Sequence, residues 1–551
     1  MRTPAWFVAT TTAAVLVVAS SRAAAPKFYP DDPLRREPET QDASRAEVTE
    51  VDLFSDLLVN MFMKPGDVTP GVRAGNINTI DEVPDSSWFT NRVGTVPLTG
   101  ADISRGANVG KGPAPGRWTV VSAKLGGAAP GFRVQDSQGE VWFLTLDIKG
   151  APRAATGAIA VASRLYWALG YQQVESYLAS FRPGDLDIPE TTLYQTRTGH
   201  ERPMTPEDID QVLNISARNA DGSYRVMAQR LIPGRYVGRF RYHGTRPDDP
   251  NDIVPHEHRR ELRALQVFGA WTNFVDMKAL NTIDAVVEEN GRHVVRHYMQ
   301  DVGSMFGTGA YEPHDWDQGH EYLYEGGATW RRLVTAGFYM RPWQTKPFYV
   351  HPEIGRIEAE GFDPDRWKPT APNAALRQAR ADDTFWAALR VAAFSEEMIR
   401  AAVREARYAD PDAEAMLTRI LMERRQVILR TYLPRITPLT SFALSGTGRV
   451  TFENAAVKYG VAAAPSGGFR AAWFNFDNAT QTATPIGESA STSGDGIDPP
   501  AGWRDAQPGA YIKVSVHAVD PSRPAWAKPI DLFFRRTANG WQLVGVERTV
   551  L

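Results

Sequence analysis

Four polar side chains in the middle of the chain have types and spacing that suit metal-assisted chemistry. Asp276 is followed by Lys278 and Asn281, and Asp301 opens an Asp-x-Gly step after a further hairpin-like stretch. Mg²⁺ prefers oxygen ligands and keeps phosphate oxygens among them, so Asn281 and Asp301 are suitable metal ligands. Asp276 could orient or deprotonate an acceptor hydroxyl, and Lys278 could neutralise charge on a transferred phosphoryl group. These four residues therefore suit a site for a divalent metal ion with a carboxylate and a lysine beside it.

The segments around these residues explain how they could be brought together. Residues 258–274 carry apolar side chains at helical spacing, which predicts a helix that delivers the loop. Residues 282–287 and 293–299 are typical of two strands. Asn290-Gly291 between them is the favoured pair for a type I′ turn, because both residues tolerate positive φ. A hairpin here would return the chain to the loop and place the two metal ligands side by side.

Residues 111–436 as a whole resemble atypical bacterial kinase-like proteins of the HipA and CotH kind, on the strength of this loop and the Asp-x-Gly step. The resemblance implies that Asp276 is the catalytic-loop aspartate and that Asn281 and Asp301 bind metal. It also implies ATP with Mg²⁺ or Mn²⁺ as cofactors. The fold it implies has two lobes, a β-rich N-lobe and a helical C-lobe.

The pattern upstream agrees with such an N-lobe. Residues 118–124, 132–136 and 141–148 predict three strands joined by glycine-containing turns. A helix is predicted over 154–169, where apolar residues share one face, and Gly170 ends it.

The phosphate-binding part of the resemblance departs from the family pattern. The family's phosphate-binding lysine is expected in the third strand, where this chain has Thr145. Lys124 and Lys149 are the candidates to replace it. Gly126 and Gly127 are the candidates for a phosphate-cradling loop, because glycine lets backbone amides approach phosphate closely.

Composition sets limits on the class of protein. The 551 residues contain no cysteine, which excludes disulfides, thiolate catalysis and Cys-ligated zinc. A formal net charge of −3 gives no reason to expect nucleic acid as a partner. Residues 5–20 are mostly apolar and Ser21-Arg22-Ala23 supplies a cleavage site, which predicts a signal peptide over 1–23. We therefore expect an exported protein, periplasmic or extracellular, with no membrane span after signal removal.

The fold class expected from these patterns is α+β, in several domains. After the signal, residues 24–110 form an N-terminal extension whose first part, 24–50, is polar and predicted to be a flexible lead-in. The kinase-like domain covers 111–440, with an N-lobe to about 233 and a C-lobe from 234. Residues 441–551 alternate in short runs separated by turn residues, which predicts an all-β, sandwich-like domain.

Three functions remain open at this point. The first is an exported atypical kinase, a phosphotransferase that uses ATP. The second is an inactive pseudokinase that serves as an envelope binding or scaffold module, with an unknown protein partner on the β domain; Thr145 and the lack of any acid in helix 154–169 favour it. The third is a metal-dependent hydrolase built on His256, His258 and nearby aspartates, although these histidines would not share a helix face.

Overall fold

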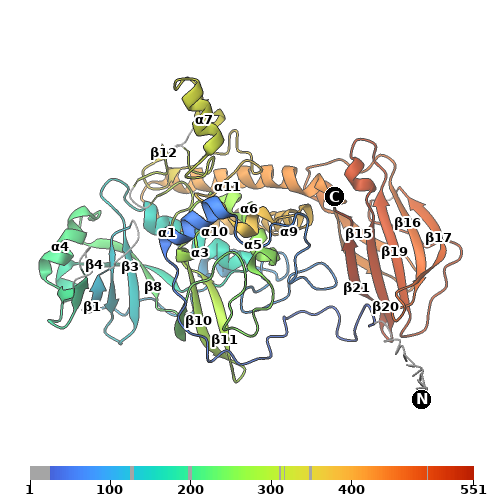
Figure 1. Cartoon of the computed structure of the whole chain (residues 1–551), viewed down its shortest axis with the longest axis horizontal. Coiled ribbons are helices and arrows are strands. Elements are labelled where there is room, and N and C mark those ends of the chain that lie inside the picture. The colour runs from blue at the N-terminus through green and yellow to red at the C-terminus, as the bar shows by residue number, and fades with distance from the viewer. Residues whose placement is uncertain are drawn as a thin grey trace, which may run out of the picture.

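The computed structural model describes residues 25–123, 129–195, 201–309, 312–315, 317–345, 350–492 and 494–550. The predicted signal peptide therefore lies outside the described residues, as do Lys124, Gly126 and Gly127. The chain has a mixed architecture of helices and sheets. Figure 1 shows one sheet at the left end, a group of helices in the middle and further sheets at the right end.

The left-hand sheet has six strands in the order β4-β8-β3-β2-β1-β5. One face packs against helix α4 (Pro206–Ile215) through Ile209 and Leu213, and the other faces helix α3. A two-stranded sheet of β6 (Leu193–Gln195) and β7 (Glu201–Pro203) lies near by. The six strands have these bounds: β1 Trp118–Ala123, β2 Gly131–Gln135, β3 Val141–Leu146, β4 Ser176–Phe181, β5 Leu186–Asp187 and β8 Tyr224–Arg230.

Helix α3 (Ala154–Leu169) has the bounds that its apolar pattern predicts. It ends at Gly170, whose φ of +121° suits glycine alone, and a Cβ there would lie 2.2 Å from the ring of Phe89. The helix is almost wholly buried, because one side faces the sheet and the other packs against α2 and α10. The remaining helices of this region are α2 Gly100–Arg105, α5 Arg260–Arg263, α6 Leu265–Thr272, α8 Ala374–Arg377, α9 Ala381–Ala392, α10 Glu396–Arg404 and α11 Pro411–Tyr432.

The helix predicted over 258–274 is shorter than expected. A 3₁₀ turn covers His256–His258, Arg259 is extended, and α5 begins only at Arg260. Pro255 precedes the turn, and the buried side chains of the turn bond to separate segments of the chain. Regular helical geometry therefore starts at Arg260, two residues later than predicted.

The predicted hairpin is present as β10 (Thr282–Glu289) and β11 (Arg292–Met299), with β9 (Arg235–Gly238) on the other edge of β10. Asn290 and Gly291 both have positive φ, +52° and +75°, as a type I′ turn requires. The local turn chemistry thus sets the register in which the hairpin returns towards the loop.

The C-terminal region forms two sheets, in the orders β14-β15-β18 and β17-β16-β19-β20-β21. One hydrophobic core runs from α3 and α11 into these sheets without a break, for example from Ile428 to Trp473. That residues 441–551 form a separate domain stays a prediction. The elements here are β14 Leu439–Leu444, β15 Val450–Asn454, α12 Ala455–Lys458, β16 Phe469–Phe476, β17 Ala483–Ser491, β18 Gly496–Ile497, β19 Tyr511–Ala518, β20 Ile530–Thr537 and β21 Gly540–Arg548.

The prediction of a flexible lead-in over 24–50 is wrong for the described part. Phe28 is buried among aromatic rings of β16 and β20, and Ala46 is fully buried against the β10–β11 hairpin. Isolated apolar residues in a polar segment show no periodicity, so sequence pattern alone does not reveal such packing. The segment continues into α1 (Leu53–Leu58) and a π-helical turn, Val59–Met63.

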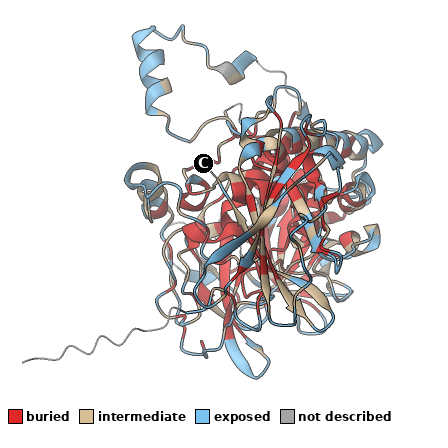
Figure 2. Cartoon of the chain, turned by 90° about the vertical axis from the view of Figure 1, so that its right-hand side faces the viewer, coloured by how far each residue is buried: buried red, intermediate tan, exposed pale blue. Residues whose placement is uncertain are grey.

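Helix α7 (Gly326–Val334) projects from the body, and short strands β12 (Val350–His351) and β13 (Gly355–Arg356) follow it. Figure 2 shows buried residues gathered in the body and exposed ones along the projecting segment. Over the described residues, no helix combines the length and the apolar character needed to cross a bilayer.

Candidate functional site

The loop after α6 closes on itself through the predicted site residues. The Asp276 carboxylate accepts hydrogen bonds from Lys278 Nζ at 2.9 Å and from Asn281 Nδ2 at 3.0 Å. Asn281 Nδ2 also donates to the Asp276 carbonyl at 2.8 Å. The two hydrogen bonds that Asn281 makes with Asp276 both use its amide nitrogen, so the amide oxygen of Asn281 is available as a metal ligand.

Asp301 adjoins this loop through the backbone. Its N–H donates to the Asn281 carbonyl at 3.2 Å, because the hairpin returns the chain beside Asn281. The Asp301 side chain is exposed, and its Oδ1 accepts from the Gly303 N–H at 3.3 Å. The structure therefore brings Asp276, Lys278, Asn281 and Asp301 into one neighbourhood, with the last contributing an open carboxylate.

The Asp-x-Gly step lies against helix α3. A Cβ at Gly303 would lie 3.1 Å from Ile159 of α3, so the absence of a side chain permits this close approach. Ile159 in turn packs with Met227 and Leu178 on the face of the sheet that α3 covers. The loop, α3 and the six-stranded sheet thus meet at one place.

Thr145, at the position where a phosphate-binding lysine is expected, lies on this same face. It is opposite Met227 in the β3–β8 register and is buried. A neutral hydroxyl here cannot supply the positive charge that a lysine would.

Polar contacts that were not predicted from the sequence join the six-stranded sheet to α3. Asp147 accepts from the Thr156 N–H at 2.8 Å and from Thr156 Oγ1 at 2.6 Å, while Arg225 Nε donates to the same hydroxyl at 2.9 Å. Burial raises the pKa of Asp147, and the Thr156 hydrogen bonds and Arg225 oppose that rise. Arg225 is 69 residues from Thr156 in the chain, so no local spacing could have indicated its contact.

Lys149, a candidate phosphate ligand, lies in the exposed turn after β3, where its N–H donates to the Ile215 carbonyl at 3.1 Å. The other candidates, Lys124, Gly126 and Gly127, fall in the gap between residues 123 and 129. The phosphate-binding roles of Lys124, Gly126 and Gly127 therefore stay predictions, because these residues lie outside the described part of the chain.

His314 is a further residue near the loop that sequence reasoning missed. It is almost fully buried, and burial lowers its pKa to about 4, although the charge of Asp276 acts in the opposite direction. The backbone N–H of His314 donates to the Gly307 carbonyl at 2.7 Å. Its ring Nδ1 has no hydrogen-bond partner in the described part of the chain. A single histidine in an irregular segment gives no signal of this placement.

The segment of helix α1 also contacts the loop. The buried Asp56 carboxylate accepts from the Ala279 N–H and from Asn60 Nδ2 at 3.1 Å. Burial raises the pKa of Asp56. The N-terminal extension is therefore part of the structure that holds the loop in place.

The histidines proposed for a hydrolase do not share a site. His256 Nε2 pairs with Asp252 at 2.7 Å, whereas His258 Nε2 pairs with Asp67 at 3.0 Å and its Nδ1 faces Arg263. Within the described ranges, no group of three or more histidine, aspartate or glutamate side chains could hold a metal ion. The hydrolase hypothesis is left without a described site.

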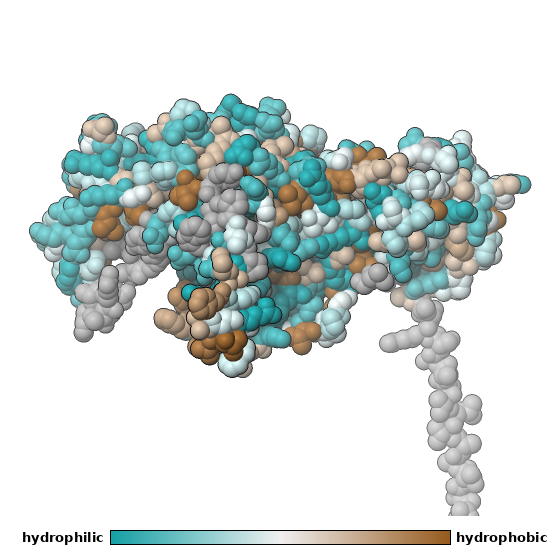
Figure 3. Space-filling view, turned by 90° about the horizontal axis from the view of Figure 1, so that it is seen from above, coloured by the Kyte–Doolittle hydropathy of each residue, from teal (hydrophilic) through white to brown (hydrophobic). Residues whose placement is uncertain are grey.

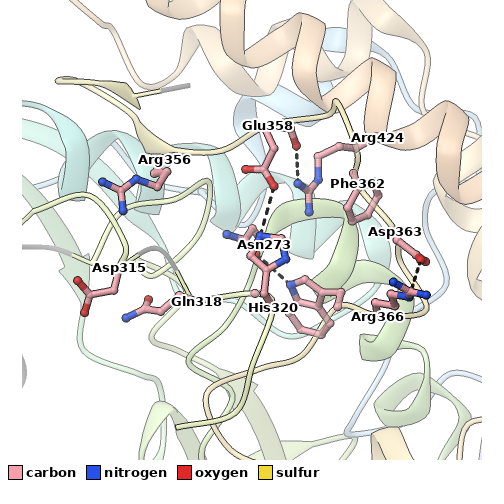
Figure 4. A pocket seen from close by; sticks show the side chains of 12 residues that line it. Asn273, Asp315, Gln318, His320, Arg356, Glu358, Phe362, Asp363, Arg366 and Arg424 are labelled. Atoms are coloured by element: carbon pink, nitrogen blue, oxygen red, sulfur yellow. Dashed lines mark hydrogen bonds and ion pairs between the residues drawn. The ribbon is translucent and has the colours of Figure 1, made fainter. Parts of the chain in front are cut away.

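Two hollows are lined by none of the four predicted site residues Asp276, Lys278, Asn281 and Asp301. Figure 4 shows a recess beside Asn273 whose volume of about 20 Å³ is room for a single water. A groove of about 670 Å³ separates α9 from β14 and β21, and its size is that of a ligand site. Its charges are balanced, so they favour no ligand class: Arg35, Arg390, Lys458 and Arg548 against Asp81, Glu82, Asp85 and Glu453.

No family model and no curated protein matches the chain. A crystal structure of the Golgi casein kinase is similar at 10% identity and a TM-score of 0.31, over 72% of this chain and 94% of that one. The same kinase with Mn/ADP bound gives 10% identity and a TM-score of 0.30, over 72% and 95%. Scores this low establish neither a common fold nor a function.

Proposed function

We propose that this chain is an exported atypical kinase-like protein that transfers a phosphoryl group from ATP to a hydroxyl. The observation that carries the proposal is the hydrogen-bonded set of Asp276, Lys278 and Asn281 beside the open carboxylate of Asp301. The contact of the Asp-x-Gly step with α3 supports it, because that contact brings the sheet and the loop to one place.

The contacts of each side chain support the role that we propose for it. Asn281, through its amide oxygen, and Asp301 would hold Mg²⁺ or Mn²⁺, which when bound neutralises phosphate charge. Asp276 would accept the proton of the acceptor hydroxyl. Lys278, already 2.9 Å from Asp276, would keep that carboxylate oriented and stabilise charge on the transferred group.

The proposal extends to the organisation of the whole chain. A two-lobed kinase-like domain over 111–440 would place the six-stranded sheet above the nucleotide and the helices below it. The C-terminal β region would offer a surface to a protein or envelope partner in the periplasm or outside the cell. The closer resemblance to HipA-like and CotH-like proteins stays a hypothesis.

A second candidate is an inactive pseudokinase that acts as a scaffold. Thr145 favours it, because this buried residue stands where a cation is needed. The contacts of Arg225 favour it too: this arginine lies two residues from Met227 on the same strand, and its guanidinium bonds to Thr156 and to the Arg407 carbonyl. It is therefore held in structural contacts and is not free to meet phosphate.

Calorimetric titration with ATP in the presence of Mg²⁺ or Mn²⁺ tests the site. Asp301→Ala should abolish metal-dependent binding, whereas Asp210→Ala, which removes an exposed carboxylate on α4, should leave it unchanged. Release or transfer of phosphate by the unaltered chain would support the kinase, and binding without turnover would support the scaffold. Binding that survives Asp301→Ala would overturn the site.

A further inference from the structure

Exposed hydrophobic side chains gather in two segments of the molecule. Of the 24 large hydrophobic residues that are exposed in the described part of the chain, 13 lie between residues 54 and 68 or between 323 and 350, and the rest are scattered. Large contiguous apolar surfaces on soluble proteins mark contact sites. The 13 residues, here called the apolar surface, are Phe54, Leu58, Phe62, Met63, Val68, Leu323, Tyr324, Trp330, Leu333, Val334, Phe338, Met340 and Val350.

The two segments meet in space. The rings of Phe62, after α1, and Tyr324, before α7, have centroids 5.6 Å apart and are tilted by 51°. Helix α1 is also fixed to the candidate loop through the bond between Asp56 and the Ala279 N–H. The two parts of the apolar surface therefore touch at this contact, and the part that belongs to α1 is bonded to the candidate loop.

Helix α7 has no buried residue over its nine positions, and it stands off the body in Figures 1 and 2. In Figure 3, hydrophobic side chains gather on a lobe that protrudes at the lower edge of the view. An isolated helix of this length is marginal in water, and most helices are stabilised by packing an apolar face. Among the described residues, helix α7 therefore has no apolar face packed against the body to stabilise it.

The charges around α7 indicate what covers it. Arg331 and Arg332 lie on the helix, which has no acidic residue of its own, and the two acids between residues 321 and 345 are already paired: Glu325 with Lys368 and Glu321 with Arg341. Helix α7 thus carries two positive charges without an acid of its own, beside exposed Trp330 and Phe338. Tryptophan next to arginine, on a convex apolar helix, suits the interface of a bilayer with anionic headgroups.

We propose that the apolar surface docks on a lipid bilayer that contains anionic lipid. Trp330, Leu333 and Phe338 enter the headgroup region, and Arg331 and Arg332 contact lipid phosphates. The chain rests on the membrane and does not span it. Docking there is independent of whether the nearby loop transfers phosphate, because it uses none of the loop's side chains.

A site-specific fluorescent label tests the proposal, since the chain has no cysteine of its own. Phe338→Cys, at an 87% exposed position, carries an environment-sensitive dye such as NBD. Ser466→Cys, in the exposed turn before β16, carries the same dye as the control. The full chain is titrated with vesicles of phosphatidylcholine and phosphatidylglycerol (3:1) and with phosphatidylcholine alone.

We expect a blue shift and a severalfold rise in emission at position 338 on the anionic vesicles, with no change at 466. Arg331→Glu with Arg332→Glu should weaken this response about tenfold or more, because each basic residue near an anionic surface contributes to binding. No response at 338 would overturn the proposal, even if vesicles bind elsewhere. A blue shift that follows protein concentration without vesicles would also overturn it, because it would identify a second copy as the occupant.

Discussion

Two groups of charged residues in this molecule each place acidic and basic side chains close together in the sequence, but they differ in how far the structure buries them. The candidate loop pairs Asp276 with Lys278 inside one short segment, and both side chains remain about a quarter exposed. The arginine cluster, by contrast, is Arg259, Arg260 and Arg263 with the acids that pair with them, and these arginines are almost fully buried.

The partners of the arginine cluster come from several distant segments. Arg260 lies 2.9 Å from Asp81 of the N-terminal extension and 2.9 Å from Asp383 of α9, and Arg263 shares Asp383 at 3.0 Å. Buried charges of this kind persist only when each has a partner. The cluster therefore joins segments, whereas the loop keeps accessible charge where a ligand can reach it.

Breaking the arginine cluster should have the largest effect on stability. Arg260→Met removes one of the buried arginine partners of Asp81 and of Asp383, which keep Arg548 and Arg263. The cluster then holds an excess of buried negative charge, and loss of one member of a buried pair costs about 3–5 kcal/mol. Arg419→Met, which removes an exposed pair with Glu423 on α11, should cost less than about 1 kcal/mol. Urea unfolding compares the two. Equal losses would show that burial does not separate these groups.

The pH dependence of stability should report His314. Because its folded pKa is near 4 and the unfolded value is about 6.5, the folded chain binds fewer protons between these limits. This contribution is fully present above pH 6.5 and is lost as pH falls through 4, by up to about 3 kcal/mol.

Unfolding midpoints of the unaltered chain and of His314→Gln, measured from pH 7 to pH 4, test this. The variant should lose less stability over that range. A variant that is as acid-sensitive as the unaltered chain would assign the effect to other groups.

The features that could be predicted from sequence are those with a local cause. The bounds of α3 follow from apolar spacing and from Gly170, and the hairpin follows from Asn290 and Gly291. The bond between the Asp301 N–H and the Asn281 carbonyl then follows from the hairpin.

Features made by distant contacts could not be predicted. The buried course of the N-terminal extension, the link from Asp147 to Arg225, and the position of His314 each join segments that are remote in the chain. Such contacts leave no period or spacing for sequence reasoning to detect.

A moderate effect is expected where the sheet meets α3. Asp147→Ala removes the acceptor for the Thr156 N–H in the first turn of α3 and leaves Arg225 without its nearby carboxylate. Loss of a helix cap costs about 0.5–2 kcal/mol. Asp147→Asn keeps one acceptor and should cost less. If thermal unfolding midpoints for the two variants coincide with that of the unaltered chain, this contact does not hold α3 to the sheet.

The smallest stability effect should come from the loop itself. Lys278→Met removes the 2.9 Å bond to Asp276, but partly exposed pairs contribute only about 0–1 kcal/mol, so urea unfolding should barely change. Metal-dependent ATP binding should weaken all the same, because the lost charge lies beside the proposed phosphate position. A loss of 3 kcal/mol or more would place Lys278 in the same class as Arg260. The loop pair would then be a structural contact, and the distinction between the two charged groups would fail.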